Sequence, residues 1–359
     1  MNRRMEKFVA LLGLPVLVCL LSAGMARAEG GVCAENPSGL TGIAAGNFYT
    51  CILKSNGNVD CDGYDFLGNA EDYSGGDAVG VATNQYHSCI LRSNGDVDCR
   101  GYNGLGQAED YCGGDAVGVA VGVAHTCILK SDGNVDCYGQ DNFGGTTDYS
   151  GGDAVGVAAG GGHTCILKSD GNVDCYGSYN FGQAEDYSGG DAVGVSAGYV
   201  HTCILKTDGN VDCYGKNQYG QANDYLGGDA VGVAAGYYHT CILKSDGNVD
   251  CYGWNSYGQA EDYFGGDAIG VGAGHAHNCI LKADGNVDCY GTNYYGEGED
   301  YFGGDAICLS GDTDGVGDAC DLAPGLEETP SGFGKGEKQG WEDSRPPGFE
   351  KGKKEGWLK

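Results

Sequence analysis

The sequence predicts an all-β protein, a seven-bladed β-propeller of 38-residue blades with three or four antiparallel strands each. Cysteines recur every 38 residues, and each has a partner ten residues further along the chain. Alternating Val, Ile and Leu surround these cysteines, and Gly-rich turns separate the runs. Seven such copies predict a propeller domain over residues 29–309, in which neighbouring sheets bury each other's faces.

One unit shows how each blade is expected to fold. Residues 231–233 alternate apolar and small side chains and predict a short first strand, and residues 239–244 predict a second. Ser245-Asp246-Gly247 fits a three-residue hairpin loop with Gly in the left-handed region. Residues 248–252 then return as a third strand, and a fourth, irregular strand is expected over residues 259–263.

The hairpin register makes the paired cysteines cross-strand neighbours. It sets Cys241 opposite Cys251, and we therefore predict seven disulfides within blades, as suits an oxidising compartment. The predicted pairs are Cys51–Cys61, Cys89–Cys99, Cys127–Cys137, Cys165–Cys175, Cys203–Cys213, Cys241–Cys251 and Cys279–Cys289. A metal site made of His239 and the two cysteines is the alternative, but Tyr49 replaces the histidine in the first unit. Four more cysteines, at positions 33, 112, 308 and 320, allow three pairings that the sequence does not decide.

The first-strand motif appears eight times, whereas there are only seven hairpins. The outermost copies are residues 40–46 and 306–309. The spare copy can pair the two ends of the domain within one blade, which favours a closed ring over an open solenoid.

Each unit reads His-Thr-Cys-Ile-Leu-Lys-Ser-Asp-Gly-Asn-Val-Asp-Cys-Tyr-Gly, followed by Asn-x-Tyr-Gly-Gln, with small variations. This pattern resembles the regulator-of-chromosome-condensation repeat over residues 39–309, although Tyr, Arg100 or Asp62 replaces the tryptophan of that family. The units are shorter than nuclear ones and are similar in this to the propeller-type β-lactamase inhibitor. The resemblance implies a seven-bladed propeller. We do not expect the nuclear exchange-factor activity of that family here, because the chain is expected to be exported and is strongly acidic.

The first 28 residues are typical of a signal peptide. Three basic residues precede an apolar run over residues 8–21, and Ala26-Arg27-Ala28 supplies a cleavage motif, so we expect cleavage after Ala28. No second apolar run follows, so no transmembrane segment is expected in the mature chain. The protein is expected to be secreted, with retention at the cell surface or in the periplasm as alternatives.

Charge narrows the range of partners. Residues 39–309 hold nine Lys and Arg against 36 Asp and Glu, a net charge of −27. Such a surface repels nucleic-acid phosphates and anionic lipid, so neither is an expected partner.

Histidine begins the second strand in six units, at positions 87, 125, 163, 201, 239 and 277. We expect each to bond to the backbone of a neighbouring blade rather than to form a catalytic or metal ring. No unit carries a unique acid, base or nucleophile, which predicts a protein that is not an enzyme.

An Asp-rich segment, residues 310–325, follows the repeats. It resembles one unit of a thrombospondin type 3 repeat, in which Asp312, Asp314, Asp318 and Asp321 would bind one Ca²⁺. A plain acidic linker is the alternative. Residues 326–359 hold two related Gly-Phe-x-Lys-Gly-x-Lys-x-Gly-Trp segments and are expected to form a flexible tail, or else a basic and aromatic motif that contacts the cell envelope.

The repeats vary mainly at the two residues before the second strand and in the stretch after the third. In an antiparallel meander both places lie at one end of the blade, so the variable, aromatic-rich positions should form one rim. We expect this rim to bind an extracellular or cell-envelope protein. The predicted contact residues are Tyr237, Tyr238, Trp254, Tyr257, Tyr294 and Tyr295. A multivalent lectin with one sugar site per blade is the first alternative, and an enzyme with a site in the central channel is the second.

Overall fold

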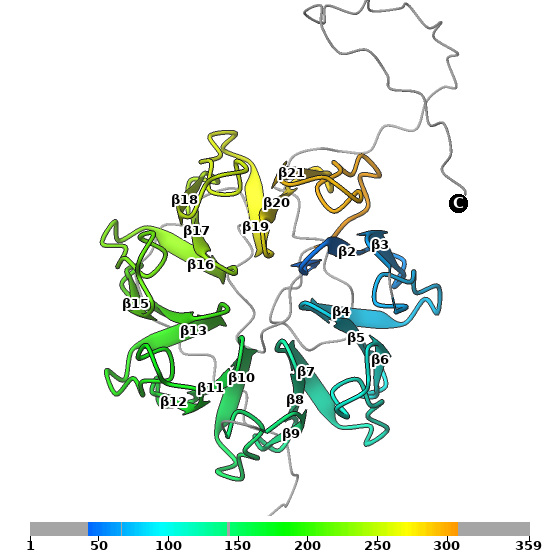
Figure 1. Cartoon of the computed structure of the whole chain (residues 1–359), viewed down its shortest axis with the longest axis vertical. Coiled ribbons are helices and arrows are strands. Elements are labelled where there is room, and N and C mark those ends of the chain that lie inside the picture. The colour runs from blue at the N-terminus through cyan, green and yellow to red at the C-terminus, as the bar shows by residue number, and fades with distance from the viewer. Residues whose placement is uncertain (1–41, 66, 142–143, 308–359) are drawn as a thin grey trace, which may run out of the picture. The chain divides into compact units, whose positions relative to one another are not determined.

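A computed structural model describes residues 42–65, 67–141 and 144–307 of the protein. Within these ranges the chain forms 21 β-strands and no helix. The strands make seven three-stranded antiparallel sheets, the blades, which stand around a common centre (Figure 1). The predicted all-β propeller architecture is confirmed. None of the described residues belongs to a helix that could span a lipid bilayer.

Each blade runs from an inner strand through a middle strand to an outer strand. The inner strands are β1 (Ile43–Ala45), β4 (Ala78–Thr83), β7 (Ala116–Val121), β10 (Ala154–Ala159), β13 (Ala192–Ala197), β16 (Ala230–Ala235) and β19 (Ala268–Ala273). The middle strands are β2 (Tyr49–Leu53), β5 (His87–Arg92), β8 (His125–Lys130), β11 (His163–Lys168), β14 (His201–Lys206), β17 (His239–Lys244) and β20 (His277–Lys282). The outer strands are β3 (Val59–Gly63), β6 (Val97–Gly101), β9 (Val135–Gly139), β12 (Val173–Gly177), β15 (Val211–Gly215), β18 (Val249–Gly253) and β21 (Val287–Gly291).

The hydrophobic core lies between blades. Residues of the middle strands up to the terminal Lys or Arg are buried, because other strands flank them and adjacent blades cover both faces. In one cluster Leu129 and Val135 of the third blade pack against Val157 and Ile166 of the fourth. A single blade cannot bury these side chains alone, so each blade is stabilised by its neighbours.

The predicted hairpin register is confirmed. Cys241 lies opposite Cys251, and Leu243 lies opposite Val249. All seven within-blade disulfides are present. Cys112 is exposed and is the free cysteine of the described residues, whereas the pairing of the other three unassigned cysteines falls outside them.

The expected fourth strand is reduced to a single bridge. Tyr263 exchanges two backbone hydrogen bonds with Val249 of the outer strand, and the chain then turns away. The Tyr263 hydroxyl donates to Asp267, which lies just before the next inner strand. The glycines at 265 and 266 make this turn, and Gly266 has φ +73°. The bridge cannot extend into a longer fourth strand, because the chain must cross to the next blade after Tyr263.

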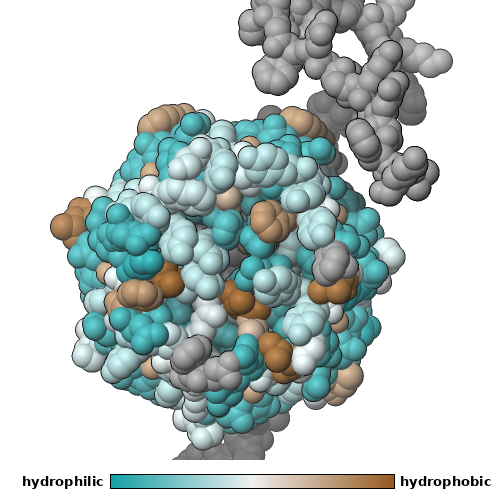
Figure 2. Space-filling model, in the orientation of Figure 1, coloured by the Kyte–Doolittle hydropathy of each residue, from teal (hydrophilic) through white to brown (hydrophobic). Residues whose placement is uncertain are grey.

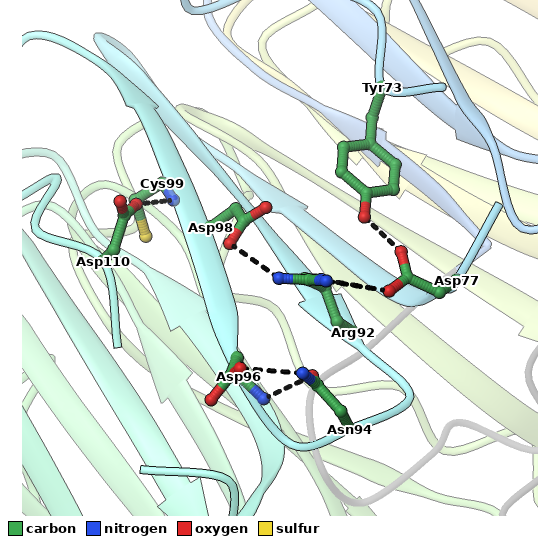
Figure 3. Close-up of polar contacts among 8 residues, drawn as sticks. All are labelled: Tyr73, Asp77, Arg92, Asn94, Asp96, Asp98, Cys99 and Asp110. Atoms are coloured by element: carbon green, nitrogen blue, oxygen red, sulfur yellow. Dashed lines mark hydrogen bonds and ion pairs between the residues drawn. The ribbon is translucent and has the colours of Figure 1, made fainter. Parts of the chain in front are cut away.

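Figure 3 shows how this link is fixed between the first and second blades. Tyr73 donates to Asp77, and the same carboxylate accepts from Arg92 of the middle strand. Arg92 also lies 3.7 Å from Asp98, and Asp110 accepts from the backbone N–H of Cys99 at 2.9 Å. The Tyr73, Asp77 and Arg92 contacts hold the linking turn against the hairpin of the second blade, and Asp110 holds the corresponding segment after β6 against that outer strand.

The two ends of the described chain meet in the first blade. β1 pairs with β2 only over Ile43–Ala45, and Ala306 forms the bridge to Lys54 that an inner strand makes elsewhere. The Ile307 N–H then donates to the Leu53 carbonyl at 3.1 Å. Ala306 and Ile307, the described part of the spare strand copy, therefore pair with the middle strand of the first blade, as the motif count predicts.

Candidate binding surface: an aromatic rim

The two variable places of the repeat lie side by side, as predicted. The Trp254 N–H, just after the outer strand of the sixth blade, donates to the Tyr238 carbonyl at 2.8 Å. Tyr64 donates to the Phe48 carbonyl of the first blade in the same way, at 2.7 Å. These bonds bring the loop before each middle strand and the loop after each outer strand to one end of the blade.

Five of the six predicted contact residues form a continuous series of ring contacts. Ring centroids lie 4.6 Å apart for Tyr237 and Tyr238 and 6.4 Å apart for Tyr238 and Trp254. The series continues from Trp254 to Tyr257 at 5.3 Å and from Tyr257 to Tyr294 at 6.4 Å. Edge-to-face contacts of this kind stabilise an aromatic cluster beyond the area they bury.

The sixth residue, Tyr295, joins the network through the first blade. Its ring lies 4.8 Å from Tyr64 and 5.7 Å from Phe48. Phe48 lies 5.9 Å from His275, and His275 lies 4.2 Å from Tyr237. The first and last blades therefore contribute to one surface, which position along the chain alone does not reveal.

We call this surface the aromatic rim. Tyr199 stacks on Tyr237 at 3.8 Å, and Tyr219 lies 5.6 Å from Tyr238, which extends the rim into the fifth blade. Its members are Phe48, Tyr64, Tyr199, Tyr219, Tyr237, Tyr238, Trp254, Tyr257, His275, Tyr294 and Tyr295.

The rim has a packed base and an exposed top. Tyr294 is 71 % exposed, Tyr295 54 % and Tyr257 47 %. Tyr237 and Tyr238 are half-buried, and desolvation raises the pKa of both phenols, so they are neutral hydroxyl groups. The three exposed tyrosines can therefore contact a partner while the half-buried rings fix their positions.

A buried carboxylate holds the loop that carries Tyr294 and Tyr295. Glu297 accepts from the backbone N–H of Tyr294 at 3.2 Å and of Tyr295 at 2.7 Å. The sixth blade uses Gln259 instead, whose carbonyl oxygen accepts from the Tyr257 N–H at 3.0 Å. Glu297 was not among the predicted site residues, although the replacement of the usual Gln by Glu in one unit is visible in the sequence.

The repeat histidines lie at the junctions between blades. His87 Nε2 is 2.8 Å from Thr126 Oγ1 of the next blade, and Thr126 in turn donates to the Gln107 carbonyl at 2.7 Å. Because the hydroxyl proton is used there, the histidine donates through Nε2–H. Burial lowers the pKa of His87 to about 3, so the ring is neutral near pH 7. The predicted backbone partner in a neighbouring blade is present for His125, which has a backbone hydrogen bond to His163 of the fourth blade. At His87, His163, His201 and His277 the prediction was wrong, because the partner is the threonine side chain and Nδ1 has none. Equivalent bonds join His125, His163, His201 and His277 to Thr164, Thr202, Thr240 and Thr50.

One junction departs from this pattern. His239 is fully buried, and neither ring nitrogen has a hydrogen-bond partner. Asn278 stands where the other units carry a hydroxyl residue, and its amide nitrogen lies 3.5 Å from the sulfurs of Cys241 and Cys251. The junction between the sixth and seventh blades therefore lacks the hydrogen bond that the other His–Thr junctions make.

The inner strands line a central cavity of about 220 Å³. Its described lining is mainly Gly, Ala and Val, and includes no Asp, Glu, Lys, Arg or Cys. Figure 2 shows hydrophobic side chains gathered around the hollow at the centre of one face. Among the described residues no three His, Cys, Asp or Glu side chains are grouped to hold a metal ion. The four aspartates expected to bind Ca²⁺ lie outside these residues, and calcium binding there stays a prediction.

Comparison with known families decides the identity of the repeat. The regulator of chromosome condensation (RCC1) repeat matches six times, over residues 78–107, 116–144, 154–183, 192–221, 230–259 and 268–297. The chain belongs to the RCC1 repeat family. A comparison with curated proteins found no match.

Solved structures show the same fold. The CRINKLY WD40 ectodomain of the Arabidopsis thaliana receptor kinase ACR4 is 21 % identical, with a TM-score of 0.62, and the match covers 73 % of this chain and 99 % of that one. Human WBSCR16 is 17 % identical with a TM-score of 0.58, over 69 % of this chain and 88 % of that one. Prp20p of Saccharomyces cerevisiae is 19 % identical with a TM-score of 0.55, over 65 % and 80 %.

The first RCC1-type blade lies outside the six matched ranges and carries the largest departures. Tyr49 replaces the junction histidine, is fully buried, and donates to the His87 carbonyl at 2.6 Å. The longer side chain thus reaches the backbone of the second blade instead of a threonine hydroxyl.

Proposed function

We propose that this RCC1-repeat propeller is a secreted, non-enzymatic scaffold that binds a protein partner through its aromatic rim. The observation that carries the proposal is the continuous network of eleven rings across four adjacent blades, with Tyr257, Tyr294 and Tyr295 exposed at its top. Exposed tyrosines held by a rigid scaffold lose little conformational entropy on binding and are typical interface anchors.

The uneven distribution of the rings favours one binding surface over one sugar site per blade. At the position of Tyr237-Tyr238 the third blade carries Val123-Ala124, and the fourth carries Gly161-Gly162. A lectin with a site in every blade would need the same contact residues in each. The described lining of the central cavity includes His275 but no Asp, Glu, Lys or Cys, so it offers no carboxylate or thiol to pair with that histidine in acid–base or nucleophilic chemistry.

Seven disulfides support a location outside the reducing cytosol. The structural relatives include a receptor ectodomain, which is consistent with an extracellular scaffold.

Serine substitution of the three exposed rim tyrosines tests the proposal. Partners captured from secreted and envelope proteins are purified, and their affinity is measured for wild type and for the Tyr257→Ser, Tyr294→Ser, Tyr295→Ser variant. We expect an affinity loss of about 100-fold, since hot-spot residues typically contribute more than 1 kcal/mol each. The melting temperature should fall by only a few degrees, because these side chains are largely exposed and the variant loses only the ring contacts at the edge of the cluster.

Tyr179→Ser is the matched control, because Tyr179 is 63 % exposed in the fourth blade and lies outside the rim. A partner that binds both variants as tightly as wild type would refute the rim proposal. Specific binding on a glycan array that the triple variant abolishes, with no protein captured, would instead support the lectin.

A further inference from the structure

Every cationic side chain of the described blades already has an anionic or aromatic partner. Seven of the nine Lys and Arg residues pair with an aspartate: Lys54, Arg92, Lys130, Lys168, Lys206, Lys244 and Lys282. The other two lie over aromatic rings: Arg100 is 5.5 Å from the Tyr73 centroid, and Lys216 reaches the rim. The 36 carboxylates of the same region greatly outnumber these cations. The blades therefore present an excess of negative charge.

Lys216 shows how the rim accommodates a cation. Its Nζ lies 5.6 Å from the ring centroid of Tyr238 and 5.1 Å from that of Phe181. An ammonium group is attracted to the negative face of an aromatic ring at such distances. The exposed rings further along the rim, at Tyr257, Tyr294 and Tyr295, offer the same kind of face to a partner.

We propose that the aromatic rim binds a cationic segment of its partner, whose Lys or Arg side chains stack on the exposed tyrosines. This inference rests on the proposed function and names the chemistry of its partner. Two independent observations converge on it: aromatic faces that already hold one ammonium, and a net charge of −27 over residues 39–309, which attracts cations to the propeller as a whole. The same charge disfavours a second copy of this chain, which would bring two acidic surfaces together.

Paired peptides that differ only in charge test the inference on the full mature chain. The probe is a fluorescent Gly-Arg repeat peptide with four arginines, and its neutral partner carries citrulline at those four positions. Binding is measured by anisotropy at 0.1 M and 1 M NaCl. At 1 M the screening length falls to about 3 Å, so long-range attraction is removed while direct ring contacts remain. We expect the arginine peptide to bind at least tenfold more tightly than the citrulline peptide at both salt concentrations.

Rim variants separate stacking from general attraction to an acidic protein. Tyr257→Ser with Tyr294→Ser should weaken arginine-peptide binding about tenfold, from two exposed cation–π contacts, whereas Tyr179→Ser should not. Lys216→Met removes the internal ammonium and should tighten binding two- to threefold.

Undetectable binding of the arginine peptide, or equal binding to wild type and the double variant, would overturn the inference. Weaker binding of the arginine peptide to Lys216→Met would also overturn it, because removing a like charge from the rim should favour a cationic ligand. If the citrulline peptide binds as tightly as the arginine peptide and needs the same tyrosines, the proposal of a cationic partner is refuted. The proposal that the rim is a binding surface is then still supported.

Discussion

Acidification should destabilise the propeller through its buried histidines. Burial lowers the pKa of His87, His163 and His239 from 6.5 to about 3, and that of His125, His201 and His277 to about 4. Unfolded histidines titrate near 6.5, so between pH 6.5 and 4 the unfolded state binds more protons than the folded state. The stability contributed by neutral burial is therefore complete above pH 6.5 and is lost as the pH falls towards 4.

The magnitude follows from the pKa shifts. At pH 5, which is 1.5 units below the unfolded pKa, each histidine costs about 2 kcal/mol, because one unit corresponds to about 1.4 kcal/mol. Six such groups cost about 12 kcal/mol, which is comparable to the whole stability of a typical domain. The value for His277 already includes the opposing effect of Glu297, which raises its pKa. The lowered pKa of carboxylates such as Asp77 adds acid sensitivity only below pH 4, outside this window.

Urea unfolding of the oxidised protein at pH 7.5, 6 and 5, followed by tryptophan fluorescence, measures this loss. His201→Gln removes one titrating group, so the variant should lose about 2 kcal/mol less than wild type between pH 7.5 and 5. At pH 7.5 the variant should be the less stable protein, because the bond to Thr240 is altered. An unfolding free energy in wild type that is constant or rises between pH 7.5 and 5 would refute the assignment of neutral, buried histidines.

Two further predictions concern stability at neutral pH. Asn278→Thr should give His239 the hydroxyl partner found at the other junctions and raise the unfolding free energy by about 1 kcal/mol in urea titrations, and a decrease would show that the asparagine is the better fit there. Replacing Cys203 and Cys213 together with serine should lower it by about 3 kcal/mol, whereas Cys112→Ser should leave it unchanged. Peptide mapping without reduction that finds free thiols at positions 203 and 213 would contradict the second prediction.

The fold within a blade was predictable because two features close together in the sequence require the same strand register. The ten-residue cysteine spacing and the glycine at the hairpin turn demand the same register, so Cys241 opposite Cys251 follows from either. The contacts between blades were not predictable in this way. His87 and Thr126 are 39 residues apart, and their bond depends on how two sheets pack, which hydrophobic alternation does not specify.

Some substitutions occur in only one repeat and are visible in the sequence, but their effect cannot be predicted until the contacts with the neighbouring blades are known. Asn278 in place of threonine is one changed letter, and only the structure shows that it leaves His239 of the preceding blade without a partner. The fourth strand was overestimated for a related reason. Residues 259–263 look extended, but the chain must leave the outer strand at Tyr263 to reach the next blade.

The position of the aromatic rim follows from the different constraints on core residues and on rim-loop residues. A core residue such as Ile166 packs against the preceding blade, so a change there disturbs two repeats at once, and the framework stays uniform. Rim loops bear less of this packing and can diverge in one sector of the ring. That sector crosses the seam where the chain ends meet, since Tyr295 of the seventh blade contacts Phe48 of the first and the His275 N–H donates to the Gly46 carbonyl at 3.1 Å. The part of the rim formed by Tyr295, Phe48 and Tyr64 therefore requires the first and seventh blades to remain joined, so we expect any partner that contacts these rings to sense the pairing of the two ends of the propeller.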